Sequence, residues 1–194
     1  MLIDLTLSID MNDPIVGKAN MDQHSFMSAG HIGTHLDTYL QTTIPPEFHR
    51  RQGRLFDVSG LGDEIGMDGL SGQPVREGEF VVFHTGVLEK HGYGQAAYFK
   101  THTRLSWTLI DYLIERKVSF IGIDAAGVRY GEEHGVADRR CEAGGVYIIE
   151  NLANVGKLRD VAAASEFEVF TGWTGLKGFS GLSCRVIATV DGGL

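Results

Sequence analysis

The stretch His31-Ile32-Gly33-Thr34-His35-Leu36-Asp37 places three metal-capable side chains within seven residues. Neutral imidazoles and carboxylates are the ligands that suit zinc, manganese or ferrous iron. Because His35 and Asp37 are two residues apart, their side chains point to the same face of an extended segment. Gly33 allows the backbone to bend so that His31 can join them. The pattern predicts a metal site; the alternative is a turn with hydrogen-bonded polar groups.

The same pattern, His-x-Gly-Thr-His-x-Asp, resembles the signature of the metal-dependent cyclase/hydrolase family that includes bacterial kynurenine formamidase. Further similarities follow in order along most of the chain: Ile3-Asp4-Leu5-Thr6, Phe83-His84-Thr85-Gly86, Leu105-Ser106, Ile121-Gly122-Ile123-Asp124 and Ile148-Ile149-Glu150-Asn151-Leu152. The resemblance implies an α/β fold of the swivelling β/β/α type, with a mixed, partly barrel-like sheet flanked by helices. It also implies assembly as a homodimer or homotetramer.

The resemblance assigns the metal ligands as well. His31, His35 and Asp37 match the ligands of a first ion, and Asp37 would bridge to a second ion. Glu150 matches the family's distant carboxylate at that second ion. The cofactor implied is a divalent metal, zinc or manganese, with one or two ions per chain. The alternative for Glu150 is a residue that caps its strand in solvent.

Asp138 stands twelve residues before Glu150, where formamidase-like members commonly carry a metal-binding histidine. An aspartate can bind a divalent ion, and oxygen in place of nitrogen shifts the preference from zinc toward manganese or magnesium. Alternatively, Asp138 could pair with Arg139 or Arg140 on a solvated loop. His134 could serve as a substitute ligand if the loop 131–135 folds inward.

The chain also departs from the family pattern at Tyr39 and Gln41, where the family usually has proline and histidine. In the family's hydrolases that histidine is thought to shuttle a proton, and an amide does not titrate near neutral pH. Gln41 is therefore expected to orient substrate or bind metal through its carbonyl oxygen. His102 is the predicted proton donor to the leaving group, with His49 as the alternative. Aromatic residues near the motif are predicted to line the substrate pocket: Phe26, Phe48 and Tyr39. Core packing is the alternative for each.

Composition excludes several classes of function. With 194 residues, the chain fits one domain, 1–194, with a sizeable core. A formal charge of −8 argues against nucleic-acid binding, which needs a basic surface. No apolar run approaches the ~18 residues that a membrane span requires. The two cysteines are far apart and predict reduced thiols in a cytoplasmic protein.

Apolar runs predict strands at 2–9, 80–84, 118–123, 146–149 and 184–190. A helix is predicted from about Ser106, its cap, to Lys117 in its last turn. The region 44–78 is rich in Pro, Gly and charge, and we expect mostly loops with short elements there.

The function predicted from these patterns is hydrolysis of an amide, lactam or ester of a small molecule by metal-activated water. Because Gln41 replaces a histidine, we expect slow or absent hydrolysis of N-formylkynurenine. The alternative is a catalytically degenerate family member that acts as a metal-dependent small-molecule binding protein.

Overall fold

The apolar runs near 80, 120 and 147 form three adjacent parallel strands at the centre of the fold. A computed structural model of the protein describes residues 1–10, 12, 14–101, 103–162 and 166–190. The three strands are β5 (Phe80–His84), β7 (Phe120–Ile123) and β8 (Tyr147–Glu150), and all their residues are buried. Strands covered on both faces carry continuous apolar runs, which is why the sequence reveals them.

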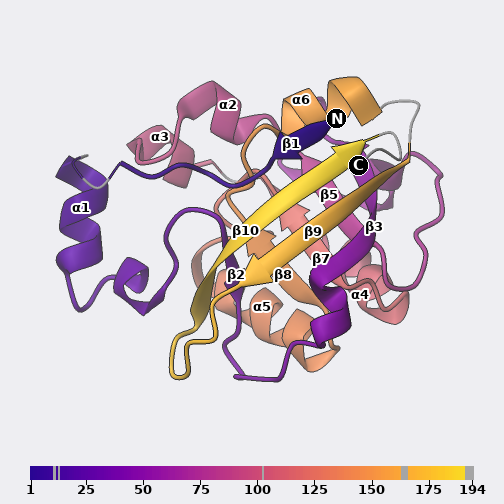
Figure 1. The fold of residues 1–194 in the computed structure, drawn as a ribbon. Helices are drawn as coiled ribbons and strands as arrows, with labels where there is room; N and C mark the ends of the chain where they lie inside the picture. Colours follow the sequence, from indigo (N-terminus) through magenta and orange to yellow (C-terminus); the bar gives the residue numbers. More distant parts are fainter. Residues whose placement is uncertain (11, 13, 102, 163–165, 191–194) are drawn as a thin grey trace.

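The remaining large strands close this sheet into a barrel. β3 (Arg50–Asp57) runs parallel to β5, and β9 (Phe167–Trp173) pairs with both β3 and β10 (Gly181–Val190). β2 (His35–Asp37) joins β10 to β8, so the closed order is β10-β2-β8-β7-β5-β3-β9. β1 (Leu2–Asp4) adds to β10. Figure 1 shows β9 and β10 as a long hairpin across the front. The predicted mixed, barrel-like sheet with flanking helices is confirmed.

Helices and short elements surround the barrel. The α-helices are α1 (Pro14–Met21), α2 (Val87–His91), α3 (Ala96–Phe99), α4 (Trp107–Glu115), α5 (His134–Ala143) and α6 (Val155–Ala162). The 3₁₀ helices are η1 (Phe26–Ala29), η2 (Pro46–His49), η3 (Met67–Leu70) and η4 (Gly131–Glu133). β4 (Glu64–Ile65) and β6 (Arg104–Leu105) form a separate small sheet. None of the helices in the described residues has the length and apolar character needed to cross a membrane.

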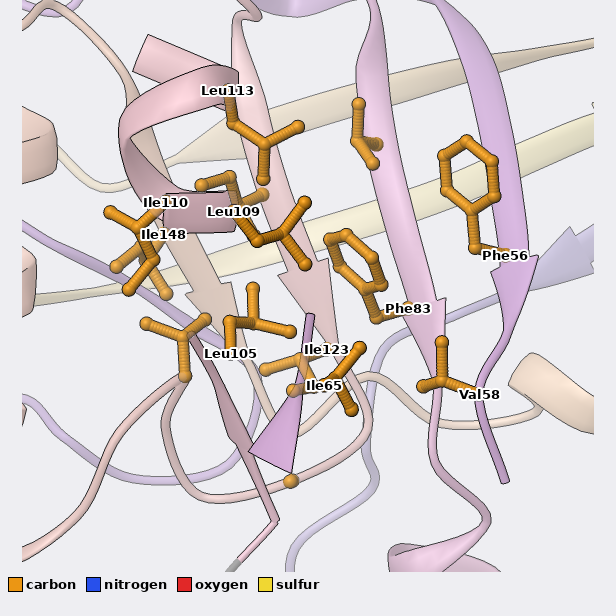
Figure 2. Packing of buried hydrophobic residues seen from close by; sticks show 14 of the residues in the cluster. Phe56, Val58, Ile65, Phe83, Leu105, Leu109, Ile110, Leu113, Ile123 and Ile148 are labelled. Carbon is orange, nitrogen blue, oxygen red and sulfur yellow. The ribbon is translucent and has the colours of Figure 1, made fainter. Parts of the chain in front are cut away.

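Alternate residues of the strands face two apolar cores. The core inside the barrel includes Leu36, Phe80, Val82, Phe120, Ile149, Val169 and Val186. The outer core lies between the parallel strands, α4 and the small sheet. In Figure 2, Leu109 and Leu113 of α4 pack over the strand residues Phe83 and Ile123, near Ile65 and Leu105 of the small sheet. Burial of each such side chain contributes about 1.5–3 kcal/mol, so these strands form a rigid base.

The structure corrects three details of the sequence-based prediction. β1 ends at Asp4: Val186 N of β10 donates to the Thr6 hydroxyl instead of a backbone carbonyl, and Leu7 N donates to Thr34 Oγ1. Ser106 caps α4 as expected, but the helix ends at Glu115, and Lys117 lies beyond it at φ 52°. The region 44–78 contains the eight-residue strand β3, which is only partly buried and therefore lacks a continuous apolar run.

Candidate metal centre

Strand β2 presents two ligand-capable side chains on the outer face of the barrel. Leu36 packs inside the barrel, so His35 and Asp37 on either side of it point outward. The register between β2 and β8 pairs His35 with Glu150. Gly33 has φ 59°, in the left-handed region that favours glycine, and the bend there brings His31 back toward the strand.

His31, His35 and Asp37 form a tight group, which we call the β2 cluster. His31 Nδ1 lies 3.1 Å from His35 Nε2 and 3.0 Å from Asp37 Oδ1. His35 Nε2 lies 3.5 Å from the same Asp37 oxygen. Two ligand atoms bound at ~2.0–2.1 Å to a tetrahedral zinc ion stand roughly 3.3 Å apart. The three atoms therefore have the spacing of ligands to one ion.

Hydrogen bonds orient both imidazole rings of the β2 cluster. Ser180 Oγ, just before β10, lies 2.8 Å from His31 Nε2. His35 Nδ1 lies 2.8 Å from the carbonyl oxygen of Gly33, a contact in which the ring nitrogen must donate. Asn151 Nδ2 donates to the same carbonyl at 2.9 Å. Such contacts fix the tautomer and the ring orientation, which leaves the other nitrogen of His35 available to a metal.

Helix α5 brings a second group, the α5 cluster, to the other side of Glu150. His134 and Asp138 lie one helical turn apart, and His134 Nε2 is 3.3 Å from Asp138 Oδ2. The same nitrogen is 3.2 Å from Glu150 Oε1, whereas Glu150 Oε2 is 3.5 Å from His35 Nε2. Ligand atoms of the whole cluster lie within 4.8 Å of one another: Asp37, His134, Asp138 and Glu150. Asp37 and Glu150 thus connect the two clusters.

The carboxylates give the centre a strong attraction for positive charge. Burial lowers the pKa of His35, but Asp37 and Glu150 outweigh burial and raise that pKa to about 9. Burial also opposes protonation of His134, yet Glu150 and the other carboxylates raise its pKa to about 10. For Asp138, burial and the charge of Asp37 both raise the pKa well above its usual range. These three groups therefore hold protons more strongly than usual, which shows that the centre favours positive charge.

The residues present fit a divalent ion. Among the described residues, both oxygens of Asp37, both of Asp138 and Oε1 of Glu150 are buried without a hydrogen-bond partner. Imidazole nitrogens approach three of these oxygens to within 3.5 Å, but without the alignment of a hydrogen bond. Burying carboxylates without partners is costly, and coordination of a metal removes that cost.

A cavity of about 560 Å³ opens onto these clusters. Its lining combines ligand-capable groups with aromatic and apolar side chains: Ala19, Ser25, Met27, His31, His35, Tyr39, Tyr93, Phe99, Ala126, Tyr130, Gly131, His134, Gly135, Glu150 and Asn151. A second cavity of about 450 Å³ lies against β3 and α6. In the part of the chain that the structure describes, no group of three metal-capable side chains lies at this second cavity. Of these two cavities, the first therefore combines a binding space with the candidate ligands.

Comparison with known proteins places the chain in a family. Residues 3–129, more than half of the chain, match the family model described as "Putative cyclase". The chain belongs to the cyclase family. The resemblance that the sequence motifs carry is thereby confirmed. No curated protein sequence matches the chain.

Solved structures share the fold of this cyclase-family chain. A potential metal-dependent hydrolase with cyclase activity is 23% identical, with 97% of this chain and 96% of that chain covered and a TM-score of 0.71. Isatin hydrolase A from Labrenzia aggregata, bound to benzyl benzoate, is 20% identical, with coverage of 97% and 93% and a TM-score of 0.75. Isatin hydrolase A from Ralstonia solanacearum is 18% identical, with coverage of 98% and 92% and a TM-score of 0.73.

The five ligand residues that the sequence suggested for this cyclase-family chain lie together: His31, His35, Asp37, Asp138 and Glu150. Asp138 and Glu150 are each only 3% exposed. A solvated loop for Asp138 and a solvent-exposed cap for Glu150 are therefore both wrong. Asp138 faces Asp37 and His134, because it lies on the buried side of α5.

Of the residues predicted to contact substrate or transfer protons, some line the cavity and others do not. Tyr39 lines the cavity, with its ring centroid 5.4 Å from that of His31. Gln41 does not line it. Its Nε2 donates to the carbonyls of Thr38 and Phe179 at 2.6 Å, and its Oε1 accepts from Gly178 N at 3.0 Å. Gln41 therefore ties β2 to the turn of the β9–β10 hairpin.

The other predicted residues do not join the cavity, or fall outside the description. Phe48 packs with Phe120 at a ring-centroid distance of 5.5 Å, so the core-packing alternative holds for it. His49 is exposed beside β3. His102 lies outside the described residues, as does the side chain of Phe26.

Sequence reasoning gave little weight to His134 and did not find Ser180 or Asn151. His134 begins α5, so it does not depend on an inward-folding loop. Its spacing of four residues from Asp138 was the available signal, because these positions share a helix face. Ser180 is 149 residues from His31 in the chain, and no local pattern connects them.

Proposed function

We propose that this cyclase-family protein is a metal-dependent hydrolase that cleaves an amide, lactam or ester of a small molecule. The observation that carries the proposal is the convergence of buried imidazoles and carboxylates without hydrogen-bond partners beside a 560 Å³ cavity. The names of structural relatives, a potential metal-dependent hydrolase and two isatin hydrolases, support the reaction class.

The β2 cluster would hold the ion, with zinc or manganese as the candidates. A bound divalent ion supplies Lewis acidity, which lowers the pKa of water from 15.7 toward about 7 and polarises a carbonyl oxygen. The chain contributes the fixed positions of its ligands. Ser180 and the Gly33 carbonyl hold the two imidazoles, so little reorganisation accompanies binding.

Tyr39 and Tyr93 are suited to orient the substrate. Burial, with the charge of Asp37, raises the pKa of Tyr39 above its usual range, so its hydroxyl remains a donor at neutral pH. Burial likewise raises the pKa of Tyr93, whose oxygen accepts from Gly33 N at 2.9 Å and whose proton is free to point elsewhere. With Met27 and Phe99 they give the cavity an apolar wall. We retain His102 as the candidate that delivers a proton to the leaving group.

The test is turnover of a panel of formamides, lactams and aryl esters by chelator-treated protein, alone and after addition of zinc or manganese. We expect hydrolysis of at least one class only after metal is restored, and slow or no hydrolysis of N-formylkynurenine. Thermal stabilisation by a panel compound without turnover would instead favour a metal-dependent binding protein. That second candidate rests on Gln41, whose amide occupies the position of a titrating histidine in the resembled pattern. Turnover that survives complete removal of metal would contradict the proposal.

A further inference from the structure

We propose that His134 supplies the imidazole ligand of the second ion in the α5 cluster, and that this ion binds more weakly than the ion of the β2 cluster. The inference rests on the proposed function, because the two clusters share Asp37 and because Glu150 of the α5 cluster also faces His35. It adds a ligand on α5 and an order of occupancy.

The geometry of His134 points to a ligand rather than a surface side chain. Its Nε2 faces two carboxylates, at 3.2 Å from Glu150 and 3.3 Å from Asp138. Asp138 is 3% exposed, and among the described residues neither of its oxygens has a hydrogen-bond partner. A lone imidazole does not satisfy these oxygens, whereas a divalent ion bound among them does.

The surrounding backbone leaves space for this ring. Gly127 has φ 112°, and a Cβ atom there would lie 2.8 Å from two atoms of the His134 ring. The same Cβ would lie 2.7 Å from the carbonyl oxygen of Arg129. Only glycine fits both the backbone conformation and the close approach of the imidazole. The loop that precedes α5 therefore provides, at Gly127, the space that the His134 ring occupies.

The two clusters differ in how firmly their imidazoles are held. The side chains of His31 and His35 are 6% and 1% exposed, and Ser180 and the Gly33 carbonyl hold their second nitrogens. The side chain of His134 is 26% exposed and lines the cavity. In the described residues, no hydrogen bond holds its Nδ1. Outer contacts of this kind change metal affinity by about 10–100-fold, so we expect the α5 ion to bind weaker by that factor.

The donor atoms differ as well. The β2 cluster offers two imidazoles and one carboxylate, a set that suits zinc. The α5 cluster offers one imidazole and three carboxylates, an oxygen-rich set that suits manganese or magnesium better. His134 and Glu150 of the α5 cluster line the cavity, so ions in solution can reach this site. Occupancy of this site should therefore follow the free concentration of the ion.

The experiment is a titration of chelator-treated, full-length protein with Mn²⁺, in which bound ion is counted from the loss of the EPR signal of free Mn²⁺. Wild type should bind two ions per chain, in two steps separated by about 10–100-fold. His134→Gln should lose the weaker step and keep the tighter one. His49→Gln, which changes an exposed histidine away from the cavity, should keep both steps.

A double variant, His134→Ala with Asp138→His, moves the imidazole one turn along the same face of α5 and should restore the weaker step. Three results would overturn the inference while leaving the proposed function intact. They are a single ion in wild type, two equal steps, or two unchanged steps in His134→Gln. A wild-type protein that binds no divalent ion would overturn the proposed function and this site together. Circular dichroism of each variant shows whether loss of a step reflects misfolding.

Discussion

Ser180→Ala removes a hydrogen-bond partner of the β2 cluster without touching a proposed ligand. Ser180 Oγ lies 2.8 Å from His31 Nε2, on the side of the ring opposite to the nitrogen that faces His35 and Asp37. Without the hydroxyl, the ring is less firmly oriented and its tautomer is less strongly selected. Loss of such a contact costs about 10–100-fold in metal affinity, which corresponds to about 1.4–2.7 kcal/mol.

The assay is competition for Zn²⁺ between the protein and a chromophoric chelator at pH 7. Ser183→Ala is the matched control, because Ser183 lies three residues further along, on β10, and is exposed. We expect the affinity of the tight site to fall in Ser180→Ala and to remain at the wild-type value in Ser183→Ala.

Equal affinities for Ser180→Ala and wild type would refute the reasoning that this hydroxyl orients a ligand. Equal losses of affinity in both serine variants would show that the effect comes from a general disturbance of the segment 180–183 and not from the contact with His31. Thermal unfolding of the metal-free variants separates these outcomes, because removal of one partly buried hydrogen bond should cost only about 0.5–1.5 kcal/mol of stability.

Other predictions concern charge, the hairpin and the α5 loop. In the metal-free protein, His35 has its pKa raised to about 9, so its protonation stabilises the fold fully below about pH 6.5, and this stability is lost as pH rises through about 9. Chelator-treated protein should therefore melt at a lower temperature at pH 9.5 than at pH 6.5, and the metal-loaded protein, in which an ion replaces the proton, should not show this drop. Gln41→Ala removes two hydrogen bonds to the hairpin and one to the Thr38 carbonyl, and should lower the free energy of unfolding in urea by about 1–3 kcal/mol; an unchanged value would show that the hairpin is held by other contacts. Gly127→Ala should displace the His134 ring and weaken the second Mn²⁺ binding step more than the first. An equal loss of affinity in both steps would contradict the tight fit of the His134 ring against Gly127.

The central strands were predictable because their pattern is local. β5, β7 and β8 are buried on both faces, so each appears in the sequence as an unbroken apolar run. β3 and β9 were not found, because each has partly exposed residues along its length and mixes polar with apolar side chains. Closure of the barrel depends on the pairing of β9 with β3, which no short-range signal encodes.

In the candidate site, too, the part with a local sequence pattern was predictable and the part that depends on distant residues was not. The β2 cluster could be read from seven consecutive residues, because strand alternation and one glycine bend determine its geometry. The α5 cluster could not, because it depends on where the helix begins. Because α5 starts at His134, the His134 ring and the Asp138 carboxylate lie on the helix face that is directed toward Glu150. The replacement of a histidine by Gln41 was visible, but its hydrogen bonds to a hairpin more than 130 residues away were not.

The most direct test of the central claim is the metal content of wild type and Asp37→Asn, measured by elemental analysis after identical purification and metal loading. Asparagine keeps the size of the side chain but removes the charge that both clusters share. We predict at least one divalent ion per chain in folded wild type and a large loss of bound metal in folded Asp37→Asn. Equal metal content in the two proteins, or no metal in either, would contradict the account.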